Sequence, residues 1–154
     1  MRMSLIRSSY FPDPLPEIGE HEIEFAVYPH TGNWTNARST RCGYEFNNRL
    51  EAFYDDPHEG ILGDVMTTVE VEPENIIIAS IKRAEDDDSI ILRMYETNGV
   101  ETVGNVKISL LAETVVETDL LEQPIGDIVK IQNGVFSSVF KPYEIKTFKL
   151  SDIG

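Results

Sequence analysis

Residues 75–111 read NIIIASIKRAEDDDSIILRMYETNGVETVGNVKISLL, and their composition sets the fold class. Three segments, at 75–84, 89–97 and 100–111, are rich in Ile, Val, Thr and Tyr and are separated by turn residues, which is typical of β-strands. The spacing between them leaves no room for crossover helices. We therefore expect an all-β fold in which the strands pair mostly antiparallel.

Similar sequence continues on both sides of this stretch. Apolar and β-branched residues predict further strands at 65–72, 113–118 and 143–150. A series of short strands with turn residues between them is typical of a β-sandwich. We interpret residues 64–154 as a C-terminal immunoglobulin-like β-sandwich.

Turn residues make the expected hairpins more specific. Asn98-Gly99 favours a two-residue type I′ turn, because both central positions need positive φ, and such a turn would set Tyr95 opposite Thr102. Asn133-Gly134 is expected to close a second hairpin in the same way, with Ile131 opposite Phe136. Gly104, in the middle of an expected strand, predicts a β-bulge.

Residues 1–63 are interpreted as a partial β-rich segment that belongs to a larger sandwich. Strands are expected at 3–8 and 21–28, and in the second of these the apolar residues alternate with glutamates, as in a half-buried strand. A sheet with so few strands has open edges. It must therefore pack on the second domain, on another copy of the chain or on a partner chain.

One short helix and one linker complete the expected organisation. Residues 35–47 are the only plausible helix, because they lack proline and can begin from a threonine cap. The acidic, glycine-containing stretch 55–64 is interpreted as a linker. It marks the expected boundary between residues 1–63 and 64–154.

Composition indicates a folded, acidic protein. The 154 residues are 41% apolar and 26% charged, close to the average for folded domains, so wholesale disorder is not expected. The formal net charge of −14 disfavours nucleic acid and anionic membrane surfaces as partners. Cys42 is the only cysteine, which excludes an internal disulfide. Without an evident secretory signal or membrane span, a cytoplasmic location is expected.

Residues suited to holding a metal ion are not arranged as a recognised site. Asp13, His21 and His30 lie in one stretch, but neither their spacing nor a helical frame places them together, so no metal site is expected. The acidic run 85–88 offers carboxylates, which Ca²⁺ prefers, yet it lacks the spacing, glycine and terminal glutamate of an EF-hand loop. A solvated hairpin turn is the favoured interpretation of this run.

The sequence also lacks a recognised catalytic arrangement. A retaining glycosidase needs two opposed carboxylates about 5–5.5 Å apart. The acidic residues here alternate along expected strand faces or lie in turns, where solvation explains them. A Gly-x-Ser-x-Gly elbow and a glycine-rich phosphate loop are missing from the sequence. We therefore expect no catalytic residue in this chain.

Several aromatic and polar side chains suit sugar recognition by stacking and by hydrogen bonding to hydroxyl groups. The alternative is that the aromatic residues only form a small β-core. The candidate substrate-adjacent residues are Arg7, Tyr10, His30 and Trp34, and Tyr44 and Tyr54 have the same chemistry.

An ordered set of motifs resembles the rear part of one enzyme family. The opening motif runs from Leu5 to Trp34 and includes Gly19-Glu20-His21 and Tyr28-Pro29-His30-Thr31-Gly32-Asn33-Trp34. The later motifs are Cys42-Gly43-Tyr44-Glu45-Phe46-Asn47-Asn48, Val69-Glu70-Val71-Glu72-Pro73-Glu74-Asn75-Ile76, Leu92-Arg93-Met94-Tyr95-Glu96-Thr97-Asn98-Gly99 and Lys141-Pro142-Tyr143-Glu144-Ile145-Lys146-Thr147. Over nearly the whole chain, the set resembles the C-terminal β-domain region of glycoside hydrolase family 38 α-mannosidases.

The resemblance implies a role within a larger enzyme. Members of the family hydrolyse α-linked mannose with retention, using zinc and an aspartate nucleophile in an N-terminal α/β domain. No residue here matches those motifs, so the resemblance implies no cofactor in this chain and places zinc in the separate catalytic domain.

The implied partners are that catalytic domain or subunit and a mannosyl glycan, and a homo-oligomer stays open. The implied role of this chain is to support the architecture and to border the sugar site. A free-standing carbohydrate-binding or assembly module without hydrolase activity is the alternative.

Overall fold

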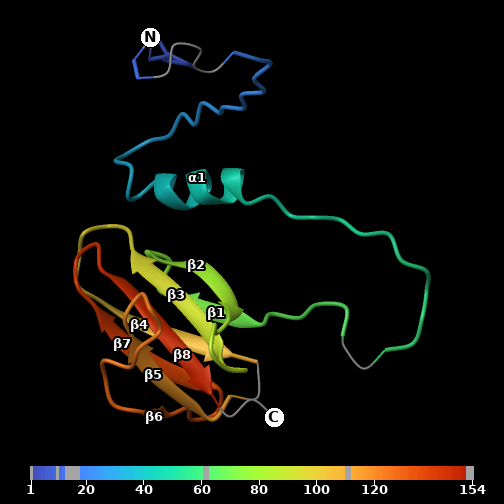
Figure 1. The fold of residues 1–154 in the computed structure, drawn as a ribbon, viewed down its shortest axis with the longest axis vertical. Helices are drawn as coiled ribbons and strands as arrows, with labels where there is room; N and C mark the ends of the chain where they lie inside the picture. Colours follow the sequence, from blue (N-terminus) through green and yellow to red (C-terminus); the bar gives the residue numbers. More distant parts are fainter. Residues whose placement is uncertain (1, 10, 13–17, 61–62, 110–111, 152–154) are drawn as a thin grey trace.

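The computed structural model describes residues 2–9, 11–12, 18–60, 63–109 and 112–151 (Figure 1). These residues form one α-helix and a series of β-strands that follow it in the sequence. The elements are α1 (Ser39–Asn47), β1 (Val69–Glu72), β2 (Ile76–Arg83), β3 (Ile90–Glu96), β4 (Thr102–Ile108), β5 (Thr114–Thr118), β6 (Val129–Lys130), β7 (Val135–Phe140) and β8 (Ile145–Ser151).

The strands form a β-sandwich, which confirms the expected all-β fold. One sheet has the strand order β1-β4-β7 and the other the order β2-β3-β8-β5-β6, and the described pairings are antiparallel. Figure 1 shows the two sheets as facing layers, with α1 outside them. The strand segments expected between residues 65 and 118 each contain one observed strand.

The core lies between the two sheets and is built from alternating side chains. In β4 every second residue is buried, from Thr102 to Ile108, because successive side chains point to opposite faces of a strand. The fully buried apolar side chains come from both sheets, so each sheet covers the other's inner face. They include Ile76, Leu92, Met94, Val106, Phe140 and Leu150.

The predicted hairpin at Asn98-Gly99 is wrong. Strands β3 and β4 lie in different sheets, and Tyr95 pairs with Ile77 and Ile145 rather than with Thr102. The physical reason is burial, because β3 and β4 both carry an apolar face, and opposite sheets bury both faces against each other. Asn98-Gly99 therefore lies in a turn that crosses from one sheet to the other.

The predicted tight turn at Asn133-Gly134 is confirmed, but the strand pairing expected beside it is wrong. Strands β6 and β7 lie in different sheets, and Phe136 pairs with Val106 rather than with Ile131. Both residues have positive φ, at 52° and 73°, as a type I′ turn requires. The flanking residues Gln132 and Val135 exchange backbone hydrogen bonds of 3.2 and 2.9 Å. This turn leads directly into β7.

The predicted bulge at Gly104 is also wrong. Gly104 pairs with Ser138 in regular register, and the shift in register lies instead in β2, between Ile78 and Ser80. A Cβ atom at Gly104 would lie 2.6 Å from the Cδ1 of Ile76 and 3.0 Å from the Cε2 of Phe140. Glycine is needed here because two core side chains fill the space above the strand.

Residues before β1 form an extended arm around α1. The predicted helix at 35–47 is confirmed over its second part, whereas the described residues of the predicted strands at 3–8 and 21–28 form no strand. No described residue before Ile76 is buried. Strands form only where a neighbouring strand accepts their backbone hydrogen bonds, and the described chain offers none to this arm.

Candidate functional site

The site is at the junction between α1 and the sandwich. Just before the helix, the guanidinium of Arg38 pairs with the carboxylate of Glu74 at 2.9 Å. One helical turn later, Arg41 donates hydrogen bonds to the backbone oxygens of Glu74 at 3.0 Å and Ile76 at 3.3 Å. Tyr44 donates to the backbone oxygen of Ala79 at 3.2 Å. These bonds fix the start of β2 beneath the helix.

A small pocket of about 90 Å³ opens at this junction. Trp34 forms part of its wall from the arm side, and its side chain is 45% exposed. The sandwich contributes the turn before β2 and the turn after β3. The residues that line the pocket are Trp34, Thr35, Arg38, Thr40, Arg41, Glu74, Asn75, Thr97 and Asn98.

A buried carboxylate holds the two sandwich turns in place. Glu96 is 1% exposed, and its carboxylate accepts hydrogen bonds from the Asn75 side chain at 2.8 Å and from the backbone N–H groups of Asn98, Gly99 and Tyr143 at 2.7, 2.8 and 3.0 Å. Burial alone would raise the pKa of Glu96, but these four donors hold its pKa below the ordinary value. The low pKa keeps Glu96 ionised, and its hydrogen bonds connect Asn75 and Asn98, which line the pocket, although Glu96 itself does not line it.

The chemistry of the pocket suits binding rather than bond cleavage. An indole face beside amide and guanidinium groups can stack on a sugar ring and hydrogen-bond its hydroxyl groups. Among the described residues that line the pocket, Glu74 is the only carboxylate, and Arg38 already neutralises it. The opposed carboxylate pair of a retaining glycosidase is therefore not formed by these residues.

Among the predicted site residues that the structure describes, only one lines this pocket. Trp34 lines it, whereas Arg7 and His30 are exposed on the arm and do not line it. The ring of His30 lies beside that of Tyr28, with 5.7 Å between their centroids. Tyr10 lies outside the described residues.

The side chains considered as metal ligands are Asp13, His21 and His30 and those of the acidic run 85–88. Within the described ranges, no group of three His, Cys, Asp or Glu side chains is arranged to hold a metal ion. Asp13 lies outside those ranges. In the acidic run 85–88, Asp87 pairs with Lys149 at 2.6 Å, and Asp88 pairs with Arg83, so the loop carries its own cations. As expected, this run connects two antiparallel strands, β2 and β3.

Sequence reasoning missed most of the pocket. Arg38 and Arg41 lie far from Asn75 in the chain, and no local pattern links them to it. The position of Glu96, two and three residues before the N–H groups of Asn98 and Gly99, is a local signal, because a carboxylate there can accept both hydrogen bonds of the turn.

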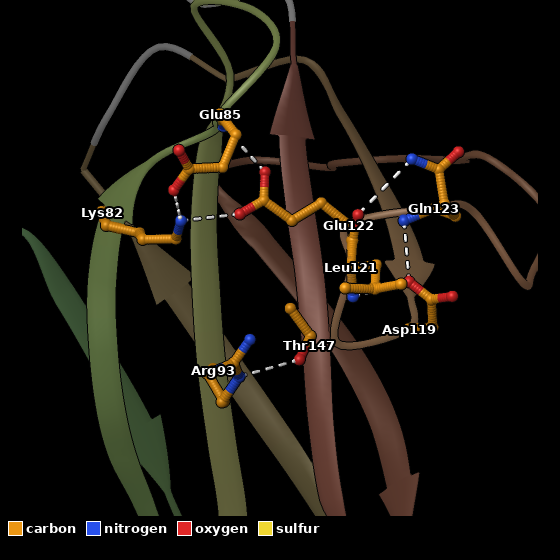
Figure 2. A network of polar contacts seen from close by, with 8 residues as sticks. All are labelled: Lys82, Glu85, Arg93, Asp119, Leu121, Glu122, Gln123 and Thr147. Atoms are coloured by element: carbon orange, nitrogen blue, oxygen red, sulfur yellow. Dashed lines mark hydrogen bonds and ion pairs between the residues drawn. The ribbon is translucent and has the colours of Figure 1, made fainter.

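A second polar cluster is structural. Figure 2 shows Glu122, from the loop after β5, reaching the end of β2 and the hairpin loop that follows. Its carboxylate lies 2.7 Å from the Lys82 nitrogen and accepts the backbone N–H of Glu85 at 2.9 Å. The Lys82 hydrogen bond lowers the pKa of Glu122, and in return Glu122 raises the pKa of Lys82. The cluster ties one loop to one hairpin and does not line the pocket.

Comparison with known proteins places this architecture in a family. Residues 75–148 match the family model described as the glycosyl hydrolases family 38 C-terminal beta sandwich domain. The match covers most of the observed sandwich, from the residue before β2 into β8. This sandwich is a family 38 C-terminal β-sandwich domain.

The similarity to whole proteins extends beyond the family 38 sandwich. Alpha-mannosidase G of Dictyostelium discoideum is 31% identical over 96% of this chain, and Alpha-mannosidase of Saccharomyces cerevisiae is 29% identical over 97%. Alpha-mannosidase 2C1 of Mus musculus is 28% identical over 97% of this chain. The chain spans only 14, 16 and 15% of these relatives, respectively. The matched region therefore includes the arm and α1 as well as the sandwich.

A search of the described residues for membrane-spanning helices found none that is long and apolar enough.

Proposed function

We propose that this chain serves as the non-catalytic C-terminal β-region of an α-mannosidase. The observation that carries the proposal is that proteins named α-mannosidases match 96 to 97% of the chain, through both the arm and the family 38 sandwich. The proposed reaction of the whole enzyme is hydrolysis of α-linked mannose with retention.

The reacting groups of that enzyme are proposed to lie in a separate α/β domain, together with zinc. The described residues of this chain do not fit zinc, because they form no group of metal-ligating side chains. No step of the reaction is therefore assigned to them. The proposed partner of this chain is the catalytic domain or subunit.

The proposed contribution of this chain is architectural, with one contact to the glycan. The pocket beside Trp34 has the aromatic and polar groups for a mannosyl unit at the border of the sugar site. The assignments of Arg7, Tyr10 and His30 as substrate-adjacent stay predictions for the assembled enzyme. The cytoplasmic location also stays a prediction.

Complementation tests the proposal. The Saccharomyces cerevisiae relative, shortened by the region that this chain matches, would be mixed with the purified chain, and release of nitrophenol from an α-mannoside would be measured. We expect no release by the chain alone, little by the shortened enzyme and clear release by the mixture. Activity of the pure chain with zinc would contradict the non-catalytic assignment, and an inactive mixture would contradict the role in the enzyme.

One observation favours a second function. The Trp34 pocket is already formed in the chain by itself, which suits a free-standing carbohydrate-binding module. Calorimetry with mannose and mannobiose would separate the two functions. Binding by the isolated chain that is lost in the Trp34→Ala variant would favour the binding module. If neither the native chain nor the Trp34→Ala variant gives a heat of binding with these sugars, the enzyme subunit is favoured.

A further inference from the structure

Residues 22–28 in the arm have the pattern of a β-strand but no partner strand. Their sequence, EIEFAVY, alternates between glutamate or small residues and large apolar residues. The apolar side chains Ile23, Phe25 and Val27 are 40, 57 and 70% exposed. Within the described ranges, these residues belong to no sheet and form no backbone pairing with another segment.

Two contacts orient this segment against α1. Glu24 pairs with Arg49, which follows the last turn of the helix, and the Tyr28 hydroxyl donates to the backbone oxygen of Ala37 at 3.2 Å, just before the first turn. Figure 1 shows the segment passing along the side of α1 that faces away from the sandwich. The segment therefore runs antiparallel to the helix and is held at two points.

The two contacts also decide which face points outward. Glu24 and Tyr28 are an even number of residues apart, so they lie on the same face of an extended chain, and that face is turned toward α1. Ile23, Phe25 and Val27 occupy the opposite face of the extended chain, and each is at least 40% exposed. Exposed backbone groups and an apolar face that nothing covers are the features used in β-strand addition.

We infer that residues 22–28 add as a strand to the open edge of a β-sheet in the part of an α-mannosidase that lies outside this chain. In the assembly, the apolar face enters the core of that sheet, and α1 covers the polar face. The inference rests on the proposed function and names the structure to which the chain attaches.

Two observations favour this partner over a second copy of the chain. The relatives match this chain over the arm as well as the sandwich. The match covers only 14 to 16% of each relative, so most of each relative lies outside the matched region. Two copies would each carry a formal net charge of −14, and pairing their strands would bring Glu22 and Glu24 of both copies close together.

Amide hydrogen exchange tests the inference in the complementation mixture described above. We expect the amides of residues 22–28 to exchange rapidly in the chain alone and at least about tenfold more slowly in the complex, because strand pairing protects backbone N–H groups. The Phe25→Asp variant is expected to weaken the complex by roughly tenfold or more, since it places a charge in the partner's core. Phe25→Leu should bind nearly as well as the native chain.

A matched control separates this effect from loss of folding. Ile128 is 73% exposed in the loop before β6, so Ile128→Asp makes the same kind of change away from the arm and is expected to leave binding unchanged. All three variants should keep the thermal unfolding of the native chain, because both positions are exposed.

Each outcome decides between the alternatives. An active complex in which residues 22–28 still exchange rapidly would overturn this inference and leave the proposed function standing. Failure to form any complex would overturn both. Protection in the chain alone, together with a dimer mass, would assign the strand to a second copy and overturn the inference.

Discussion

Glu96 shows at the residue scale how one buried charge organises three turns. Its carboxylate receives donors from the turn before β2, the turn after β3 and the turn before β8. We expect Glu96→Gln to lower the free energy of unfolding at pH 7 by about 2 kcal/mol, because the amide places a donor against N–H groups that need an acceptor. Urea unfolding of both proteins measures this. Equal stability would show that the turns hold without the charge.

The same carboxylate predicts a dependence on pH. Since the pKa of folded Glu96 is lowered, its contribution to stability is present above the pKa of the unfolded chain, near 4, and is lost as the pH falls through the folded value. The difference in stability between the native chain and Glu96→Gln should therefore shrink below about pH 4. A difference that stays constant down to the acid transition would contradict this.

Asp87 provides a second measurable titration. Its hydrogen bond from Lys149, at 2.6 Å, and that from the backbone N–H of Ser89, at 2.9 Å, hold the pKa of Asp87 at about 2. We expect NMR titration of the side-chain carboxyl to give this low pKa in the native chain. In Lys149→Met the pKa should rise toward the ordinary aspartate value, and an unchanged titration would assign the shift to other groups.

At the scale of elements, Gly104 allows β4 to pack closely against core side chains. Its strand β4 runs under Ile76 and Phe140, which leave no room for a methyl group. Gly104→Ala is expected to destabilise the sandwich by about 1–3 kcal/mol through overpacking. Denaturant unfolding gives the value.

A double-mutant cycle identifies the contact. Ile76→Val removes the Cδ1 atom that would lie 2.6 Å from the new methyl group, so the double variant should lose less stability than the sum of the single variants. Additive losses would show that the strain arises elsewhere, and the obvious second place is the Phe140 ring.

Strand positions were predictable at this scale, but strand partners were not. The apolar pattern located β1 to β5 because alternation is a local property. Neither Asn-Gly pair joins two strands of one sheet. Asn98-Gly99 lies between β3 and β4, and Asn133-Gly134 lies between β6 and β7, and in each case the two strands belong to different sheets. A turn motif alone does not specify which strands pair.

For the whole molecule, the structure predicts unequal stability along the chain. Residues 50–81 contain no lysine or arginine, so the last tryptic site before Lys82 in β2 is Arg49, in the exposed chain after α1. Brief digestion under native conditions should cut at Arg49 and leave a resistant fragment that begins at Leu50. The packed core keeps the sandwich folded, so its own lysines and arginines are cut more slowly. Mass spectrometry identifies the fragment. Early cuts at Arg83 or Arg93 would contradict the expected order.

The candidate site depended on the whole molecule more than the fold did. Trp34 could be chosen from its chemistry alone, but Arg38, Glu74 and Asn98 line the same pocket only because α1 docks on the turn before β2 and on β2. The hydrogen bond from Arg41 to Glu74 joins residues 33 positions apart, and such long-range neighbours leave no periodic signal in the sequence.

The sequence by itself determined the all-β class, the positions of most strands, the turn at Asn133-Gly134 and the resemblance to family 38, because alternation, turn propensity and motif order act over short distances along the chain. Only the tertiary structure decided which strands share a sheet, why Gly104 must be glycine and which residues form the pocket. It also showed that no strand in the described part of the chain pairs with residues 22–28. The physical reason is that burial and pairing are satisfied between segments far apart in the chain, and a strand pattern becomes a strand only when another edge completes its hydrogen bonds.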